Sequence, residues 1–98
     1  MRESVREIDR STAFKKDLRR EAKGVNLTAL NAELPVILSL LVNDLPLPEK
    51  YKDHKLTGEW EGYRECHIKG NLLLIYEKPD DRMLYLARFG SHSELFGL

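Results

Sequence analysis

The sequence has a single cysteine, no formal net charge and no long apolar run. One cysteine cannot form a disulfide within the chain, and no apolar stretch at the N-terminus resembles a signal peptide. The longest apolar run, residues 34–42, is too short to span a bilayer and is interrupted by Pro35 and Ser39. We therefore expect a protein of a reduced, cytoplasmic compartment that has no membrane segment.

The balance of charge argues against nucleic-acid binding that depends on net charge alone. Sixteen Lys and Arg residues are matched by sixteen Asp and Glu residues, which is not the composition of a strongly electrostatic binder. The charges are unevenly spread, because residues 1–30 carry eight basic and five acidic side chains whereas residues 31–62 carry three and six. A basic face on a neutral protein is therefore still compatible with the composition.

The sequence also lacks internal repeats, low-complexity tracts and Cys/His spacings of the structural zinc type. At 98 residues, of which 42 % are hydrophobic, the chain is long enough for one compact domain and too short for two. We expect residues 1–98 to form a single domain around a single core.

The chain is organised around residues 51–67. This stretch contains two of the three histidines, the only tryptophan, the only cysteine and two glycines. It is too polar and too rich in glycine for a simple core segment, yet it leads into the apolar residues 72–76. The combination is typical of an active-site loop that leads into a strand.

The end of this stretch predicts a cluster of ionisable side chains. Alternate side chains of a strand share a face, about 7 Å apart, so Glu65 and His67 lie side by side while Cys66 points to the opposite, mostly apolar face. The turn at residues 58–62 can bring His54 back as a third member. The alternative is a solvated strand face with ordinary surface histidines. Cys66 is expected to be a small buried hydrophobe and not a nucleophile.

The N-terminal half predicts a strand and two helices. Residues 5–10 alternate weakly, which indicates a short strand. Ser11 or Thr12 can cap a helix that ends at Gly24. Its core-facing side chains recur every four residues: Phe14, Leu18 and Ala22. Five basic side chains occupy the remaining surface and form either a solvated face or a binding surface: Lys15, Lys16, Arg19, Arg20 and Lys23.

The second helix is expected from Asn26 or Thr28 to Asn43. Its apolar stripe consists of Leu27, Leu30, Leu34, Ile37, Leu38 and Leu41. Because proline removes a helical hydrogen bond, Pro35 either kinks this helix or marks the start of its main part. Residues 44–48 then break the helix.

The C-terminal part predicts a β-hairpin of residues 72–78 and 83–89 around a turn at residues 79–81. The first strand is apolar on both faces, as in the centre of a sheet. Alternation divides the second strand into two faces, with Leu84, Leu86 and Arg88 on one and Met83, Tyr85, Ala87 and Phe89 on the other. Residues 90–96 form a turn or a single helical turn. The element order predicts an α+β domain with two helices on one face of a largely antiparallel sheet.

Three runs carry a family resemblance: Leu-Pro-Glu-Lys-Tyr-Lys-Asp-His-Lys-Leu at 47–56, Gly-Glu-Trp-Glu-Gly-Tyr-Arg-Glu-Cys-His at 58–67 and Gly-Ser-His-Ser-Glu-Leu-Phe at 90–96. They resemble the YafQ-type toxins of the RelE-like superfamily, which belong to bacterial type II toxin–antitoxin systems. The similarity covers nearly all of residues 45–97. It implies a RelE-like domain of β-α-α-β-β-β order, and an endoribonuclease that cuts mRNA in the ribosomal A site.

The resemblance also implies partners and site residues. The partners are a cognate antitoxin that silences the toxin, mRNA and the ribosome, and operator DNA bound only through the antitoxin complex. The family's functional positions correspond to His54, Glu65, His67, Arg88, His92 and Phe96. The family varies between Asp and Glu at Glu65, and this chain departs from it at Asn71, where relatives often carry an acid.

The chemistry of RNA cleavage fits these residue types. The 2′-hydroxyl of the substrate can serve as nucleophile, so the protein needs a base, an acid for the leaving 5′-oxygen and positive charge near the phosphate. We expect His92 to be the principal acid/base residue, the other two histidines to share the second proton transfer, and Glu65 to orient a histidine or the RNA. Arg88 can bind a phosphate and Phe96 can stack on a base, and no metal or organic cofactor is required.

Other interpretations compete with this one. The same superfamily contains gyrase-poisoning toxins, which resemble non-enzymatic inhibitors and would not need this histidine set. An inactive subunit kept for assembly with antitoxin and operator DNA is a third function. Trp60 and Tyr63 are expected to pack at the base of the loop, and Phe96 either pins the chain end to the core or stacks on RNA.

Overall fold

A computed structural model describes residues 5–97 of the chain, so residues 1–4 and 98 of the expected domain lie outside the described part. The strands are β1 (Glu7–Arg10), β2 (His54–Lys55), β3 (Arg64–Lys69), β4 (Leu72–Glu77) and β5 (Met83–Gly90). They form one sheet in the order β1-β5-β4-β3-β2, in which β1 is parallel to β5 and the other neighbours are antiparallel. The helices are α1 (Thr12–Glu21), α2 (Leu27–Val42) and α3 (His92–Phe96), with single 3-10 turns η1 (Glu49–Tyr51) and η2 (Gly58–Trp60).

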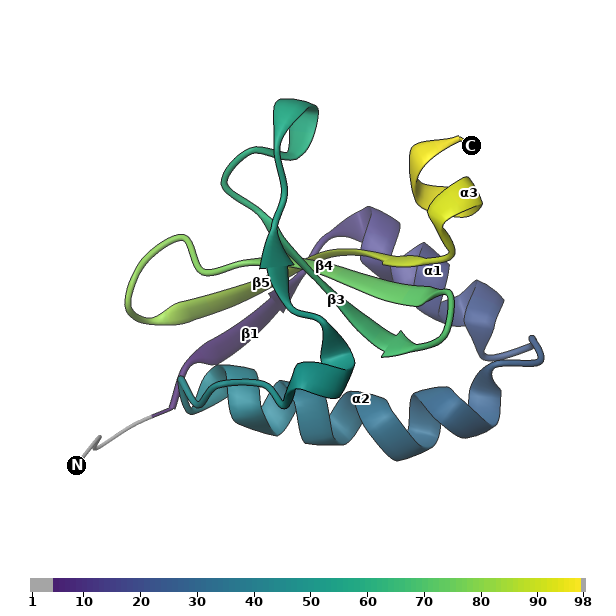
Figure 1. The fold of residues 1–98 in the computed structure, drawn as a ribbon, viewed down its shortest axis with the longest axis horizontal. Coiled ribbons are helices and arrows are strands. Elements are labelled where there is room, and N and C mark those ends of the chain that lie inside the picture. The colour runs from purple at the N-terminus through teal and green to yellow at the C-terminus, as the bar shows by residue number, and fades with distance from the viewer. Residues whose placement is uncertain (1–4, 98) are drawn as a thin grey trace.

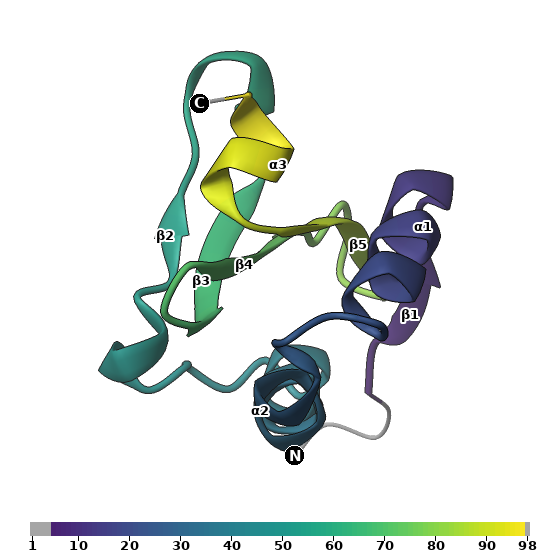
Figure 2. The ribbon, with the colours of Figure 1, turned by 90° about the vertical axis from the view of Figure 1, so that its right-hand side faces the viewer.

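This order confirms the predicted α+β fold, and the two-residue strand β2 and the tail helix α3 complete it. Figure 1 shows the sheet above α2, and Figure 2 shows α1 and α2 against one side of it and α3 on the other. The central strand β4 is buried on both faces, as its apolar sequence predicts.

Two apolar clusters lie on the two faces of the sheet, where one core was expected. The larger is covered by α1 and α2 and includes Phe14, Ile37, Cys66, Leu74 and Phe89. The smaller consists of Leu73, Ile75, Ala87 and Leu95, and the loop around Trp60 packs against it. The sheet therefore has a thick, helix-covered side and a thin side that carries the short tail helix.

Helix α1 begins where the sequence predicts, because the Ser11 side chain accepts a hydrogen bond from the Phe14 N–H at 2.8 Å. Phe14 is buried, but Ala22 is exposed and lies beyond the end of the helix, so this member of the predicted stripe is wrong. Asp17 and Glu21 are buried in its place. A carboxylate on the core side of a helix needs partners, and α1 finds them in β5 and in its own arginine.

Helix α2 runs unbroken through Pro35, so a start of the main helix at this proline is wrong. Pro35 and Asn31, whose carbonyl loses its helical partner, are both exposed. Water can therefore replace the missing hydrogen bond, and the helix tolerates the proline. Within the predicted stripe, Ile37 is fully buried whereas Leu27 remains exposed.

A β-bulge interrupts the alternation along β5. Ile75 pairs with Arg88, but the next residue of β4, Tyr76, pairs with Leu86, so one residue of β5 is extra. Ala87 lies with Tyr85 on the smaller core, as predicted, but the predicted faces of Arg88 and Phe89 are wrong. Phe89 packs with Leu86 in the larger core, and Arg88 moves to the opposite face with its partner Ile75.

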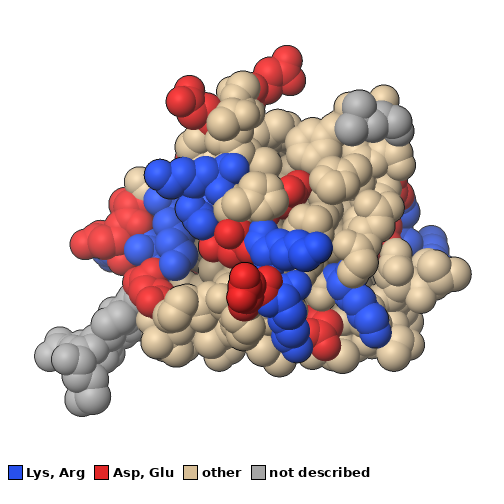
Figure 3. Space-filling model, in the orientation of Figure 1, with Lys and Arg blue, Asp and Glu red and all other residues tan. Residues whose placement is uncertain are grey.

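The surface carries mixed charge. In Figure 3, Lys and Arg side chains on the face shown are interspersed with Asp and Glu, so this face is not continuously basic. Among residues 5–97, no helix is both long and apolar enough to cross a membrane.

Candidate active site

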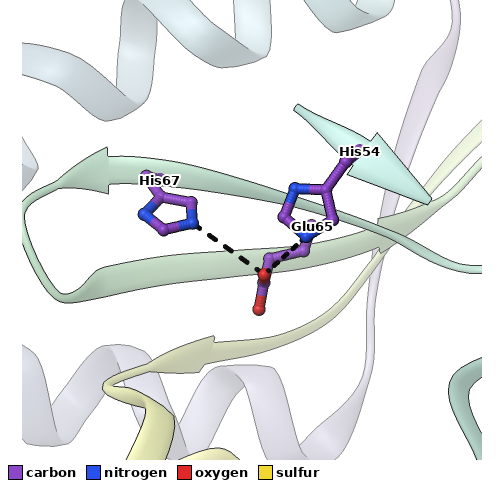
Figure 4. Close-up of side chains that lie close together, drawn as sticks. All are labelled: His54, Glu65 and His67. Atoms are coloured by element: carbon purple, nitrogen blue, oxygen red, sulfur yellow. Dashed lines mark ion pairs between the residues drawn. The ribbon is translucent and has the colours of Figure 1, made fainter. Parts of the chain in front are cut away.

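The pairing of β2 with β3 places His54 directly opposite Glu65. The chain between them turns back through Gly58 and Gly62, whose φ angles of 69° and 94° favour glycine. As Figure 4 shows, the His54 ring then points at the Glu65 carboxylate, and His54 Nε2 lies 3.0 Å from Glu65 Oε2. The predicted return of His54 to this strand is confirmed.

Glu65 is the centre of the site. Its side chain is only 4 % exposed, although it carries a carboxylate. His67 Nε2 lies 3.9 Å from Oε2 on the same face of β3, and His92 Nε2 lies 3.7 Å from Oε1. All three histidines of the chain therefore surround one buried carboxylate, and adjacent rings are 6.1 to 6.2 Å apart between centroids.

The two Glu65 oxygens differ in their hydrogen bonds. Within the described part of the chain, Oε1 is buried and has no hydrogen-bond partner, whereas Oε2 faces His54. A buried carboxylate oxygen without a donor is costly, and His92 Nε2, at 3.7 Å from Oε1, lies just beyond hydrogen-bond distance.

His54 is held by acceptors on both sides of its ring. Its Nδ1 lies 2.7 Å from the Lys52 carbonyl oxygen, and its Nε2 faces Glu65. The ring can donate to both acceptors only when both nitrogens carry a proton. The side chain is 49 % exposed, so it is also open to a ligand.

The tail helix α3 brings His92 to this cluster. Ser91 caps the helix by accepting from the Glu94 N–H, and Glu94 accepts from the Ser91 N–H in return. Leu95 is buried and pins the helix to the sheet, whereas His92 is 45 % exposed. Phe96 is half-buried, with its ring centroid 5.7 Å from that of His92.

The aromatic residues of the loop pack as predicted. Trp60 and Tyr63 meet edge to face at 5.3 Å between centroids, and Trp60 meets Phe96 edge to face at 6.5 Å. Both loop residues are partly buried against the smaller core. The loop thereby supports the ring of Phe96 beside the histidines.

Arg88 shares the face of the histidines because of the bulge in β5. Cross-strand pairing aligns His54, Glu65, Ile75 and Arg88 in one row. With neighbouring strands about 4.8 Å apart, Arg88 starts about 10 Å from Glu65. Its Nε and Nη2 donate to Asp17 at 2.7 and 3.0 Å, and these hydrogen bonds raise the pKa of Arg88 above its ordinary value.

Cys66 and Asn71 stand apart from the cluster. Cys66 is fully buried in the larger core, and burial raises the pKa of its thiol well above the usual range. This confirms its expected role as a small buried hydrophobe. Asn71 is exposed in the turn before β4.

Sequence reasoning missed two carboxylates that support the site. Asp17 accepts hydrogen bonds from Arg88. Asp53, the residue before His54, accepts hydrogen bonds from Arg64 and from the Tyr76 hydroxyl. Asp17 could have been found, because it lies three residues after Phe14 on the core side of a helix. Nothing in the local sequence marks Asp53.

The site also has the donor set of a metal centre. One ligand atom from each of His54, Glu65 and His67 lies within 4.8 Å of the others. Two imidazoles and a carboxylate are typical ligands of zinc and copper. A metal bound there would occupy the same lone pairs that acid–base chemistry requires.

Comparisons with known proteins agree with the resemblance seen in the sequence. The family model for a bacterial toxin of type II toxin-antitoxin systems, YafQ, matches residues 6–97. The mRNA interferase toxin YafQ of Escherichia coli strain K12 is 40 % identical over 96 residues, which cover 94 % of this chain and 97 % of that protein.

Two crystal structures show the same fold. The structure of the E. coli DinJ-YafQ toxin-antitoxin complex matches with a TM-score of 0.80 at 38 % identity, over 95 % of this chain and 99 % of the matched chain. The structure of a metal-bound toxin from Helicobacter pylori matches with a TM-score of 0.78 at 42 % identity, over 94 % and 99 %. The family match, the sequence identity and the shared fold together show that this chain belongs to the YafQ family of toxins of bacterial type II toxin–antitoxin systems.

Proposed function

We propose that this chain is an endoribonuclease that cuts mRNA on the ribosome and thereby inhibits translation. The observation that carries the proposal is the group of three imidazoles around the buried carboxylate of Glu65. Together with Arg88 on the same face of the sheet, this group can supply the base, the acid and the positive charge that RNA cleavage needs. The E. coli relative is named an mRNA interferase, which supports the same activity here.

The reaction uses the 2′-hydroxyl of the RNA as its nucleophile. A base takes the proton of this hydroxyl while its oxygen bonds to the adjacent phosphorus. The bond from phosphorus to the 5′-oxygen breaks, and an acid protonates that oxygen. The products are a 2′,3′-cyclic phosphate and a 5′-hydroxyl end. Because the nucleophile belongs to the substrate and the side chains can make both proton transfers, the mechanism requires no metal or organic cofactor.

His92 is the principal acid/base residue in this mechanism. Its ring is well exposed and lies beside the half-buried ring of Phe96. One of the pair His54 and His67 makes the second proton transfer. Glu65 orients these imidazoles through its buried carboxylate, which faces all three rings.

Two residues bind the RNA around the reacting phosphate. Arg88 contacts a phosphate through the part of its guanidinium that Asp17 leaves free. Phe96 offers one face of its ring to a base, while Trp60 supports the ring from its edge. Stacking of this kind is worth about 1–3 kcal/mol per base.

The expected partners follow from this activity. The ribosome holds the mRNA, and His54 and His92 are exposed enough to reach it, at 49 % and 45 % of their side-chain surface. A cognate antitoxin silences the toxin, as the DinJ-YafQ complex of the relative suggests, and operator DNA is bound only through that antitoxin. The site of action is the cytoplasm, where translation takes place.

Purified toxin added to programmed ribosomes tests this function. The parent protein is expected to cut the mRNA, and His92→Gln is expected to abolish cleavage while its melting temperature stays within a few degrees. Cys66→Ala is the control that keeps the site intact. Intact mRNA at confirmed folding of the parent protein, with and without ribosomes, would overturn the proposal.

A further inference from the structure

Helix α1 holds the last residues of β5, beyond the point where the neighbouring strand β1 ends. β1 pairs with β5 only as far as Leu86. Beyond that point Asp17 Oδ2 accepts from the Phe89 N–H at 3.0 Å, and Arg20 Nη2 donates to the Phe89 carbonyl at 3.0 Å. Side chains of α1 therefore satisfy backbone groups of β5 that a strand would otherwise bind.

Asp17 is the centre of this contact. Its side chain is 3 % exposed, yet its carboxylate accepts four hydrogen bonds. Oδ2 accepts from Arg88 Nε at 2.7 Å and from the Phe89 N–H, and Oδ1 accepts from Arg88 Nη2 at 3.0 Å and Arg20 Nη1 at 2.9 Å. A buried carboxylate with this many charge-assisted partners has a fixed position.

The second arginine anchors the carboxylate from its other side. Besides Asp17, the Arg20 guanidinium binds Glu21 and Glu94, each at 3.0 Å from its Nε. It also passes so close to Gly90 that a Cβ added there would lie 2.6 Å from Nη2. Arg20 therefore has little room to move, and neither has the carboxylate that it holds.

The geometry leaves one edge of the Arg88 guanidinium free. Asp17 occupies the edge formed by Nε and Nη2. Between residues 5 and 97, Nη1 has no hydrogen-bond partner, and the side chain remains 27 % exposed. An arginine can bind a second oxyanion through its Nη1 and Nη2 edge while a carboxylate holds the first edge.

We propose that Asp17 is a positioning residue for RNA cleavage, which it serves by holding Arg88 with its free edge toward the RNA phosphate. This inference rests on the ribonuclease function proposed above. A guanidinium on a flexible side chain would have to be ordered when RNA binds, and Asp17 orders it beforehand. Asp17 itself does not contact RNA.

A double-mutant cycle tests the inference. The proteins are Asp17→Asn, Arg88→Ala and the double variant, with Asp44→Asn as the control. Asp44 also pairs with two basic residues, Arg6 and Lys78, neither of which belongs to the proposed site. Single-turnover cleavage on ribosomes and melting temperature are measured for each, below the melting transition of every variant.

The expected result separates positioning from stability. Asp17→Asn lowers the cleavage rate about 10- to 100-fold in the parent but less than about threefold in the Arg88→Ala background, because Asp17 acts through Arg88. Asp44→Asn leaves cleavage within about threefold of the parent. Cleavage by Asp17→Asn at the parent rate, or an equal loss in both backgrounds, would overturn the inference.

If Asp17→Asn does not fold, Asp17→Glu replaces it in the cycle. Glutamate keeps the charge but moves the carboxylate by one methylene, so the same loss through Arg88 is expected.

A measurement without RNA keeps this test separate from the proposed function. Nuclear magnetic resonance of arginine side chains should show slow solvent exchange of the Arg88 Nε–H in the parent and fast exchange in Asp17→Asn. If the parent cuts no RNA, the proposed function fails while this measurement still tests the contact. Fast exchange of that proton in the parent would contradict the held guanidinium.

Discussion

At the scale of single residues, the site depends on a carboxylate that is buried while its neighbours are not. The strand period places Glu65 on the side of His67, and the hairpin adds His54 from the neighbouring strand. These three positions could be predicted because each follows from alternation or from a glycine turn. The burial of Glu65 could not, since it depends on how α3 and the loop cover the thin side of the sheet.

Cys66 offers a control for the register of β3. Its side chain points into the larger core, so Cys66→Ala is expected to keep cleavage within about threefold of the parent and to lower stability by about 0.5–3 kcal/mol. A thiol reagent should leave the folded protein unmodified and react once it unfolds, because burial raises the pKa of the thiol. A thousandfold loss of cleavage in a folded Cys66→Ala protein would show that the register is wrong.

Metal ions are expected to inhibit the proposed cleavage, because they would bind the residues to which we assign the proton transfers. Zinc at His54, Glu65 and His67 would use lone pairs that proton transfer requires. Calorimetry should show zinc binding to the parent and to His92→Gln but much weaker binding to His54→Gln. Cleavage should fall with added zinc and recover with a chelator that spares magnesium. Stimulation of cleavage by zinc would contradict the metal-independent mechanism.

At the scale of elements, the tail helix carries two adjacent apolar residues for which we expect different roles. Leu95 is buried and Phe96 is only half-buried, so Leu95→Ala should cost about 2–5 kcal/mol of stability. Phe96→Ala should cost much less stability but lower cleavage about ten- to hundredfold, through the loss of about 1–3 kcal/mol of stacking. Melting curves and single-turnover cleavage on both variants decide the matter. A Phe96→Ala protein that melts as low as Leu95→Ala and cuts normally would assign the ring to the core.

The loop after α2 is expected to make the fold sensitive to acid. Hydrogen bonds from Lys78 and Arg6 lower the pKa of Asp44 to about 2. Because this pKa is below the ordinary Asp value of 3.8, the stabilisation is complete above pH 3.8 and is lost as the pH falls through about 2.

The variant Asp44→Asn tests this sensitivity by urea unfolding. It should be less stable than the parent at pH 7, by at most about 1 kcal/mol for so exposed a pair, and the difference should vanish toward pH 2. Asp81→Asn, in an exposed position of the next turn, is the control. A difference between Asp44→Asn and the parent that is the same at both pH values would contradict the assignment.

The elements differ in how far the sequence determined them. The central strand β4 and the cap of α1 follow local patterns and were predicted. The face of Arg88 was not, because a bulge depends on how two strands fit together over the core and reverses the alternation that follows it. The spacing of Asp17 from Phe14 indicates its burial, but its partners Arg88 and Phe89 could not be predicted, since they lie about 70 residues away in the chain.

At the scale of the whole molecule, a neutral protein concentrates its chemistry on one thin side of the sheet. The thick side contains most of the core, and α1 and α2 cover it. The thin side carries the three histidines, Glu65 and Phe96, and the bulge brings Arg88 to the same face. Mixed surface charge makes binding to RNA through net charge alone weak, which is compatible with the proposed action on ribosome-bound mRNA.

The ends of the cleaved mRNA test the central claim most directly. Ribosomes programmed with a labelled mRNA are treated with the parent protein and with His92→Gln, and the new ends are identified. Attack by the 2′-hydroxyl predicts a 2′,3′-cyclic phosphate and a 5′-hydroxyl with the parent, and no new ends with His92→Gln. A 3′-hydroxyl and a 5′-phosphate would mean that water is the nucleophile, and would contradict histidine-catalysed attack by the substrate's own hydroxyl.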